Sequence, residues 1–239
     1  MTHITATPIT TMSRRWRSLS PTGVNLCFHG IGTPARELEP GEARYWVSPA
    51  VFEGVLDLVA ERSDVALSFD DGNASDVLVA LPHLVRRGLT ATFFPLAGRL
   101  HGRGSLDADG LRELVGHGMD LGSHGWTHRP FPGMESPALR TELVHARREL
   151  ALAAGVPVST LALPLGRYDR SVLHAARRLA YTTVYSSDRA HARADAWLQP
   201  RYSVTSADTV AKVRQLLDRP PSLPSVLIST AKIAVKRLR

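Results

Sequence analysis

The sequence has few of the features that mark secreted, membrane-spanning or disulfide-bonded proteins. Cys27 is its only cysteine, so no disulfide can form within the chain and a disulfide scaffold is excluded. No stretch approaches the ~20 consecutive apolar residues of a membrane helix. Residues 1–20 are rich in threonine, serine and arginine and lack the apolar block of a secretory signal. These absences predict a cytoplasmic location.

Composition and charge describe an ordinary globular chain with a basic excess. Of its 239 residues, 44% are hydrophobic and 21% are charged, which is enough apolar material for a sizeable core. The 29 Lys+Arg against 22 Asp+Glu give a net charge of +7. Such an excess can mark a nucleic-acid or membrane partner, but here the basic residues form no long run and no aromatic ladder interleaves them. We therefore expect scattered, solvated charges and no nucleic-acid partner.

Short apolar runs alternate with helical patterns along most of the chain. The runs expected to be strands are residues 24–28, 65–69, 90–94, 120–123, 160–163 and 182–185. Between them, apolar residues recur at helical spacing after Ser48 and over residues 77–87, 107–116, 136–155 and 171–180. This alternation predicts an α/β fold of βα units around a parallel sheet, in one barrel-type domain. We expect that domain over residues 23–219, after a flexible lead-in (1–22) and before a basic tail (220–239).

Polar residues that could bind a cation or transfer a proton follow the predicted strands. His29 follows the first strand, Asp70 and Asp71 follow the second, and His124 follows a later one. In a parallel barrel the carboxyl ends of the strands meet at one face, so these side chains are expected to be neighbours. Two adjacent carboxylates point in different directions and can divide cation binding from proton transfer. Asp-Asp-Gly is equally consistent with an ordinary turn.

A pair of histidines adds to the case for a metal site. His124 and His128 are four residues apart, so one helical turn brings them to the same face. One aspartate with two histidines is typical of zinc sites that keep positions open for water and substrate. The alternative is two unrelated surface histidines in a chain that has 10. A third cluster, Leu161 to Asp169, could present backbone N–H groups to a ligand or be only a βα turn.

Taken in order, these residues resemble the polysaccharide deacetylases, the NodB-homology domain of carbohydrate esterase family four. Ser68-Phe69-Asp70-Asp71-Gly72 matches the first motif of that family, and the segment from Ser123-His124 to His128 matches the second. Leu163-Pro164-Leu165-Gly166 is similar to a weakened form of the third motif, and residues 90–94 match the strand that usually follows the first helix. The resemblance covers about residues 24–205.

The resemblance implies a distorted (β/α)7-type barrel and a metal-dependent hydrolase that removes N-acetyl groups from an N-acetylhexosamine-containing carbohydrate. By position, Asp70 is the general base, and Asp71, His124 and His128 hold a divalent ion, expected to be zinc. Leu165, Pro164 and Trp126 are the expected substrate-binding residues, with the backbone around Leu165 facing the oxyanion. Trp126, like Tyr45 and Trp46, could instead pack in the core.

Two departures from the family pattern affect the expected mechanism. Ala162 stands where many members have the arginine that orients the base, and Leu165 stands where they have tyrosine. The C-terminal Leu-x-His motif that supplies the general acid is absent, since no histidine follows His191. Relatives that act on poly-N-acetylglucosamine are circularly permuted and carry this histidine in an N-terminal motif, which Cys27-Phe28-His29-Gly30 resembles. We therefore expect His29 to be the general acid; the alternative is a catalytically weak or inactive carbohydrate-binding protein on the same fold.

The last residues form a separate pattern. Pro220, Pro221 and Pro224 interrupt a helix. After them, apolar residues alternate with Lys232, Lys236 and other basic residues. This pattern is consistent with peripheral contact with an anionic membrane, and also with a helix that packs on the barrel.

Overall fold

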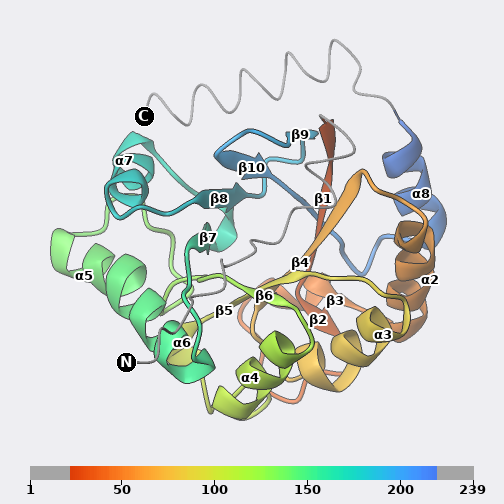
Figure 1. The fold of residues 1–239 in the computed structure, drawn as a ribbon, viewed down its shortest axis with the longest axis horizontal. Helices are drawn as coiled ribbons and strands as arrows, with labels where there is room; N and C mark the ends of the chain where they lie inside the picture. The colour runs from red at the N-terminus through yellow and green to blue at the C-terminus, as the bar shows by residue number, and fades with distance from the viewer. Residues whose placement is uncertain (1–21, 220–239) are drawn as a thin grey trace, which may run out of the picture.

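A computed structural model of the chain describes residues 22–219 (Figure 1). The predicted tail, and the predicted lead-in apart from Thr22, lie outside the described residues. Thr22 is the first residue of a strand. Within residues 22–219, no helix is long and apolar enough to cross a membrane.

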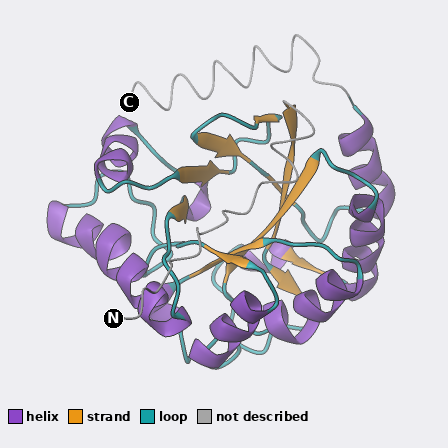
Figure 2. Cartoon of the chain, viewed as in Figure 1, coloured by secondary structure: helices purple, strands orange, loops and turns teal. Residues whose placement is uncertain are grey.

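The strands are arranged as a distorted barrel, visible in orange in Figure 2. The main path pairs five strands in the order β11-β1-β4-β5-β6, and a second sheet has the order β10-β8-β7. Their bounds are β1 Thr22–Phe28, β4 Val65–Asp71, β5 Thr92–Pro95, β6 Asp120–Leu121, β7 Thr160–Ala162, β8 Thr183–Ser186, β10 Leu198–Pro200 and β11 Tyr202–Ser203. Three short strands lie beside this path: β2 Gly30–Ile31, β3 Trp46–Val47 and β9 Ala192–Arg193.

Two junctions join the sheets into a barrel. A parallel bridge between Ser123 and Leu161 connects the end of β6 to β7. On the other side, β10 pairs with β8 and β11 pairs with β1, and only Arg201 separates β10 from β11. Counting β10 and β11 as one interrupted strand, the described chain forms a parallel barrel of seven strands, which confirms the predicted fold class.

Helices surround the strands (Figure 1). Their bounds are α2 Pro49–Ala60, α3 Leu81–Arg86, α4 Ala108–Gly116, α5 Ser136–Arg140, α6 Ala146–Ala154, α7 Arg170–Arg178 and α8 Val210–Asp218. Short 3-10 turns are η1 Glu42–Tyr45, η3 Ala97–Arg99 and η5 Pro164–Gly166, and π turns are η2 Asp76–Ala80 and η4 Thr141–His145. Among these helices, α2, α4 and α7 have ordinary N-caps. The side chains of Ser48, Asp107 and Asp169 each accept a hydrogen bond from a backbone N–H of the first turn.

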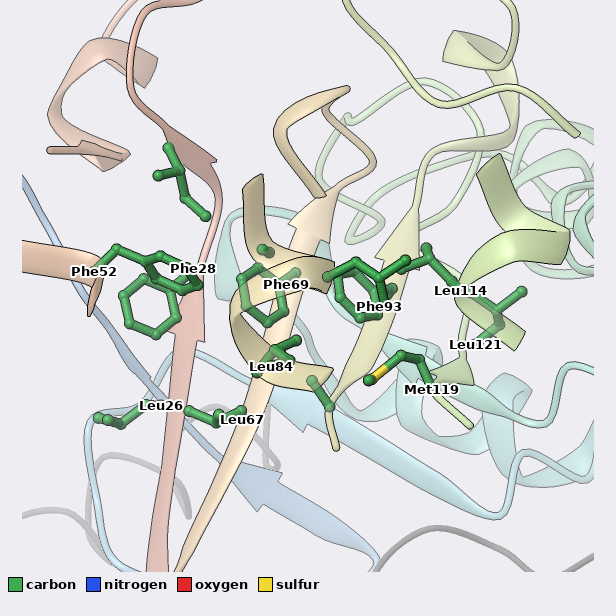
Figure 3. Close-up of a cluster of buried hydrophobic side chains, with 14 of the residues drawn as sticks. Leu26, Phe28, Phe52, Leu67, Phe69, Leu84, Phe93, Leu114, Met119 and Leu121 are labelled. Atoms are coloured by element: carbon green, nitrogen blue, oxygen red, sulfur yellow. The ribbon is translucent and has the colours of Figure 1, made fainter. Parts of the chain in front are cut away.

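A row of phenyl rings fixes the register of the first strands (Figure 3). Phe28, Phe69 and Phe93 are partners on β1, β4 and β5, and their rings stack at 5.5 and 4.6 Å between centroids. Phe52 of α2 packs edge-on against Phe28 at 5.2 Å. Because side chains alternate along a strand, these rings fill the layer between sheet and helices. The residues next to them, including Asp70, therefore face the barrel interior.

The predicted elements agree with the structure over most of the chain. Each predicted strand and helix is present to within a few residues, and the long helix of residues 136–155 forms as α5 and α6 joined by the π turn η4. The residue patterns do not predict α8 or the strands β10 and β11. Those two strands are only three and two residues long, too short for a periodic pattern.

Candidate active site

Asp70 and Asp71 occupy the end of β4, as the motif predicts. In a regular strand their side chains would point to opposite faces. Asp71 has a positive φ of 76°, a conformation that non-glycine residues rarely adopt, and this turn brings both carboxylates into one cavity. His128 and Leu165 also have positive φ and line the same cavity. Backbone strain of this kind gathers at functional sites.

His124 is held as a neutral imidazole. Its ring is buried, and its Nδ1 lies 2.9 Å from the carbonyl oxygen of Ala162, to which an Nδ1–H donates. Burial lowers the pKa of His124 to about 4, so the ring is neutral at pH 7. The free Nε2 lies 3.7 Å from Oδ1 of Asp71 and 3.9 Å from Oδ2 of Asp70. A lone pair therefore faces the carboxylates.

His128 approaches the same carboxylate from a loop. Its Nε2 lies 3.5 Å from Oδ1 of Asp71. The loop is held by Glu142, a buried residue of the π turn η4, which accepts hydrogen bonds from the backbone N–H groups of Trp126 and Thr127. A π turn inside a helix often marks a functional site; here it places Glu142 under the loop that carries His128.

The three predicted metal ligands fit a divalent ion. Ligand atoms of Asp71, His124 and His128 all lie within 4.8 Å of one another. Both carboxylate oxygens of Asp71 are buried and have no hydrogen-bond partner among the described residues, although such groups are normally satisfied. One carboxylate with two histidines is a donor set suited to zinc and similar ions. A cation between them would satisfy the oxygens of Asp71.

A second cluster of donor atoms, from Cys27, His29 and Asp70, is equally compact. It suits a cation less well, because the guanidinium of Arg201 already neutralises Asp70. Burial also raises the pKa of the Cys27 thiol well above its ordinary value, so the sulfur stays protonated. The neutralised Asp70 and the protonated Cys27 therefore favour the Asp71 cluster as the cation site.

Arg201 is a residue of the site that the sequence motifs do not predict. It donates Nη1 to Oδ1 of Asp70 at 2.7 Å and Nη2 to Oδ2 at 2.6 Å, and both side chains are buried. Burial by itself would raise the pKa of Asp70, but the charge of Arg201 outweighs it and holds the pKa well below its usual range. The arginine absent at position 162 is thus matched by one between β10 and β11.

No local sequence signal could have identified Arg201. It is one of many arginines in a basic chain, and it follows a strand too short to predict. Its guanidinium lies 5.4 Å from the ring centroid of Phe94 and 5.6 Å from that of Tyr185, which shield the ion pair. Arg201 reaches Asp70 only because the last strand closes the barrel against β1. The pairing that closes the barrel joins residues far apart in the sequence, so no local pattern reveals it.

His29 lies at the wall of the same cavity. Its ring stacks on Tyr45 at 4.6 Å between centroids, and a nitrogen of the ring lies within 4.8 Å of a carboxylate oxygen of Asp70. The buried Nδ1 of His29 has no partner among the described residues. An N-terminal histidine is therefore next to the two carboxylates, as the predicted acid role requires.

Of the three predicted substrate-binding residues, one lines the cavity and two do not. Leu165 lines the cavity, which has a volume of about 230 Å³, and its side chain is 56% exposed. Pro164 is buried in η5 and Trp126 packs against the main core, and neither lines the cavity. A Cβ at Gly98 would lie 2.7 Å from the Trp126 ring, so this glycine lets the indole pack closely. Tyr45 lines the cavity, whereas Trp46 is buried.

A seven-stranded parallel barrel with an Asp/His/His cluster and a second, ion-paired aspartate at its carboxyl edge defines a hydrolase-type site. Comparison with known proteins gives the family. The family model described as Polysaccharide deacetylase matches residues 59–184, more than half of the chain. The chain therefore belongs to the polysaccharide deacetylase family, a family of carbohydrate deacetylases.

Individual relatives agree with this assignment. The curated protein "Putative polysaccharide deacetylase YxkH" of Bacillus subtilis (strain 168) is 25% identical over 117 residues, which is 49% of this chain and 42% of that protein. The alignment thus spans less than half of that relative.

Two solved structures show the same fold. The Streptococcus pyogenes deacetylase PplD, in complex with acetate, has a TM-score of 0.73 at 20% identity over 84% of this chain and all (100%) of that one. A de-N-acetylase from Aggregatibacter actinomycetemcomitans has a TM-score of 0.67 at 16% identity over 82% of this chain and 100% of that one.

Proposed function

We propose that this protein is a metal-dependent N-deacetylase of an N-acetylhexosamine-containing carbohydrate. One observation carries the proposal: the buried Asp70–Arg201 ion pair lies beside the Asp71/His124/His128 cluster, in a cavity that His29 also lines. The supporting context is the family itself, together with a structural neighbour described as a de-N-acetylase. Asp71, His124 and His128 would hold the ion, for which zinc is the candidate.

When bound there, a divalent ion polarises a carbonyl oxygen and lowers the pKa of water. The protein's own groups supply the rest. Asp70 is kept ionised by Arg201 and accepts the proton of the attacking water. Both oxygens of Asp70 are fixed by the bidentate pair, so the carboxylate does not rotate away.

Amide hydrolysis also needs a donor for the leaving nitrogen. A protonated His29 gives its proton to that nitrogen as the C–N bond breaks, which releases a free amine and acetate. A backbone N–H near Leu165 would donate to the oxyanion that forms on the former carbonyl oxygen. The exposed Leu165 side chain would contact the sugar at the cavity mouth.

The alternative function is carbohydrate binding without catalysis. It rested on the absent family arginine and the absent C-terminal histidine. In the structure, Arg201 and His29 lie beside Asp70 from other parts of the chain, and this observation favours the enzyme.

The deciding experiment measures acetate release from N-acetylglucosamine oligomers by the metal-loaded protein. Asp70→Asn serves as the matched inactive control, and mass spectrometry of the oligomers identifies the deacetylated sugars. Acetate release by wild type and not by Asp70→Asn supports the enzyme. Oligomer binding without acetate release from any N-acetylated glycan tested supports the binding protein.

Location and membrane contact belong to the same proposal. A cytoplasmic enzyme that acts on a lipid-linked or nucleotide-linked sugar would agree with the composition. The tail, residues 220–239, lies outside the described residues. Co-sedimentation with anionic vesicles, for the full chain and for a chain that ends at Pro221, tests its membrane role.

A further inference from the structure

One metal-ligand candidate, His128, is aligned by a residue far away in the sequence. Its backbone has φ 60°, so its side chain leaves the loop in an unusual direction. Nδ1 of His128 lies 2.6 Å from Oε2 of Glu39, across a sequence separation of 89 residues. We propose that Glu39 is a positioning residue for the metal site, which accepts the Nδ1–H of His128 and so keeps Nε2 directed at Asp71. The proposal rests on the metal site of the proposed function.

The two histidines differ in what holds their outer nitrogen. For His124 it is the neutral carbonyl of Ala162, whereas for His128 it is the carboxylate of Glu39. A carboxylate accepts a stronger hydrogen bond than a carbonyl and makes the imidazole a better electron-pair donor. Glu39 therefore fixes both the direction of His128 and its strength as a ligand.

Glu39 is itself fixed, although its side chain is 45% exposed. It is part of a segment, residues 32–42, which we call the Glu39 strap. Arg99 of η3 donates to the Glu39 carboxylate, and the Glu39 N–H donates to Oε2 of Glu42 at 2.8 Å. Glu42 is buried and is also paired with Arg36.

Arg36 connects the strap to the strand that carries the aspartates. Its Nε and Nη2 donate to Oδ1 of Asn73, two residues beyond Asp71, at 3.1 and 2.9 Å. The strap is therefore tied to the end of β4, and Arg99 ties it to the turn after β5. An exposed glutamate in an untethered loop would sample many rotamers, and binding His128 would then cost side-chain entropy. Here the tethers hold Glu39 at the distance that His128 requires.

The test measures the metal affinity of the metal-free protein for Zn²⁺ and Co²⁺, by competition with a chromophoric chelator. Loss of an outer-shell partner typically weakens metal binding by ~10–100-fold, and we expect this for Glu39→Ala. Glu39→Gln should lose less, because its amide oxygen still accepts the Nδ1–H. The matched control is Glu37→Gln. Glu37 is an exposed glutamate of the strap whose backbone carbonyl, not its side chain, accepts a hydrogen bond from Arg36.

Two further readouts separate positioning from simple stability. The melting temperature of the metal-free protein should be similar in Glu39→Gln and wild type, while the Co²⁺ absorption spectrum of Glu39→Ala should change. Equal metal affinities for wild type and Glu39→Ala would overturn the proposal. A wild-type protein that binds neither ion would overturn both this proposal and the metal site. Glu39-dependent metal binding without acetate release would leave Glu39 in its role and refute only the deacetylase.

Discussion

Arg201 and Asp70 form a bidentate ion pair inside the barrel, with N–O distances of 2.7 and 2.6 Å. Position 162, where many family members have the base-orienting arginine, is a buried alanine on β7. The guanidinium instead enters from the junction of β10 and β11. An arginine thus contacts the aspartate in this chain, although it comes from a different part of the barrel.

The first prediction concerns this ion pair. Asp70→Asn should retain metal and lose ~10²–10⁴-fold in hydrolysis, because it removes the group that we propose accepts the proton of water. It should also destabilise the fold by about 3–5 kcal/mol, since Arg201 is left buried without its counter-charge. Turnover and urea denaturation measure the two effects, and unchanged turnover would show that Asp70 is only structural.

The double variant Asp70→Asn/Arg201→Met separates stability from catalysis. Replacing both charges removes the unpaired buried cation, so the double variant should be more stable than Asp70→Asn. It should remain inactive. Arg201→Lys keeps a charge but not the bidentate contact, and should fall between wild type and Arg201→Met in activity.

The second prediction concerns metal binding. His128→Ala should lose stoichiometric divalent metal after dialysis, because one of three donors is removed from a cluster that has little other support. His117→Ala, a histidine at the end of α4, is the matched control and should keep its metal. Metal content measured by mass spectrometry decides, and full retention of metal in His128→Ala would refute the ligand assignment.

The third prediction concerns His29. His29→Ala should bind metal as wild type does, lose most of its turnover, and lack the limb of the pH–rate profile at which activity falls as the acid deprotonates. Tyr45→Leu removes the ring on which His29 stacks and should lower turnover less. A His29→Ala profile that keeps both limbs would assign the acid role to another group.

The fourth prediction concerns pH and stability at Asp120, at the start of β6. Burial raises the pKa of Asp120 to about 6 from an ordinary value of 3.8. Between these values the folded state holds a proton that the unfolded state has released, so this group's contribution to stability falls as pH rises from about 4 to about 6.

Asp120→Asn removes that loss. The melting temperature of Asp120→Asn minus that of wild type should be more positive at pH 7 than at pH 4. The exposed Asp109 provides the control variant Asp109→Asn. A difference between Asp120→Asn and wild type that does not change with pH would contradict this assignment.

The sequence predicts those parts of the site that lie in local motifs. Asp70, Asp71, His124 and His128 are each a few residues from a predictable strand, and strand ends converge in a parallel barrel. Arg201 and Glu39 were missed because each reaches the site through long-range contacts. Nothing near them in sequence distinguishes them from other arginines and glutamates. Trp126 differs from these residues: its motif predicts a place at the site, and in the structure its ring packs against the main core beside Gly98.

The last strand of the barrel is interrupted at Arg201, between its pairing with β8 and its pairing with β1. Closing the barrel and delivering the guanidinium to Asp70 are therefore a single event. During synthesis, a chain that has not yet reached residue 201 has the metal-ligand candidates but no arginine partner for Asp70. Under the proposed function, hydrolysis would begin only when the ring of strands is complete, so a measurement of turnover would also report whether the barrel has closed.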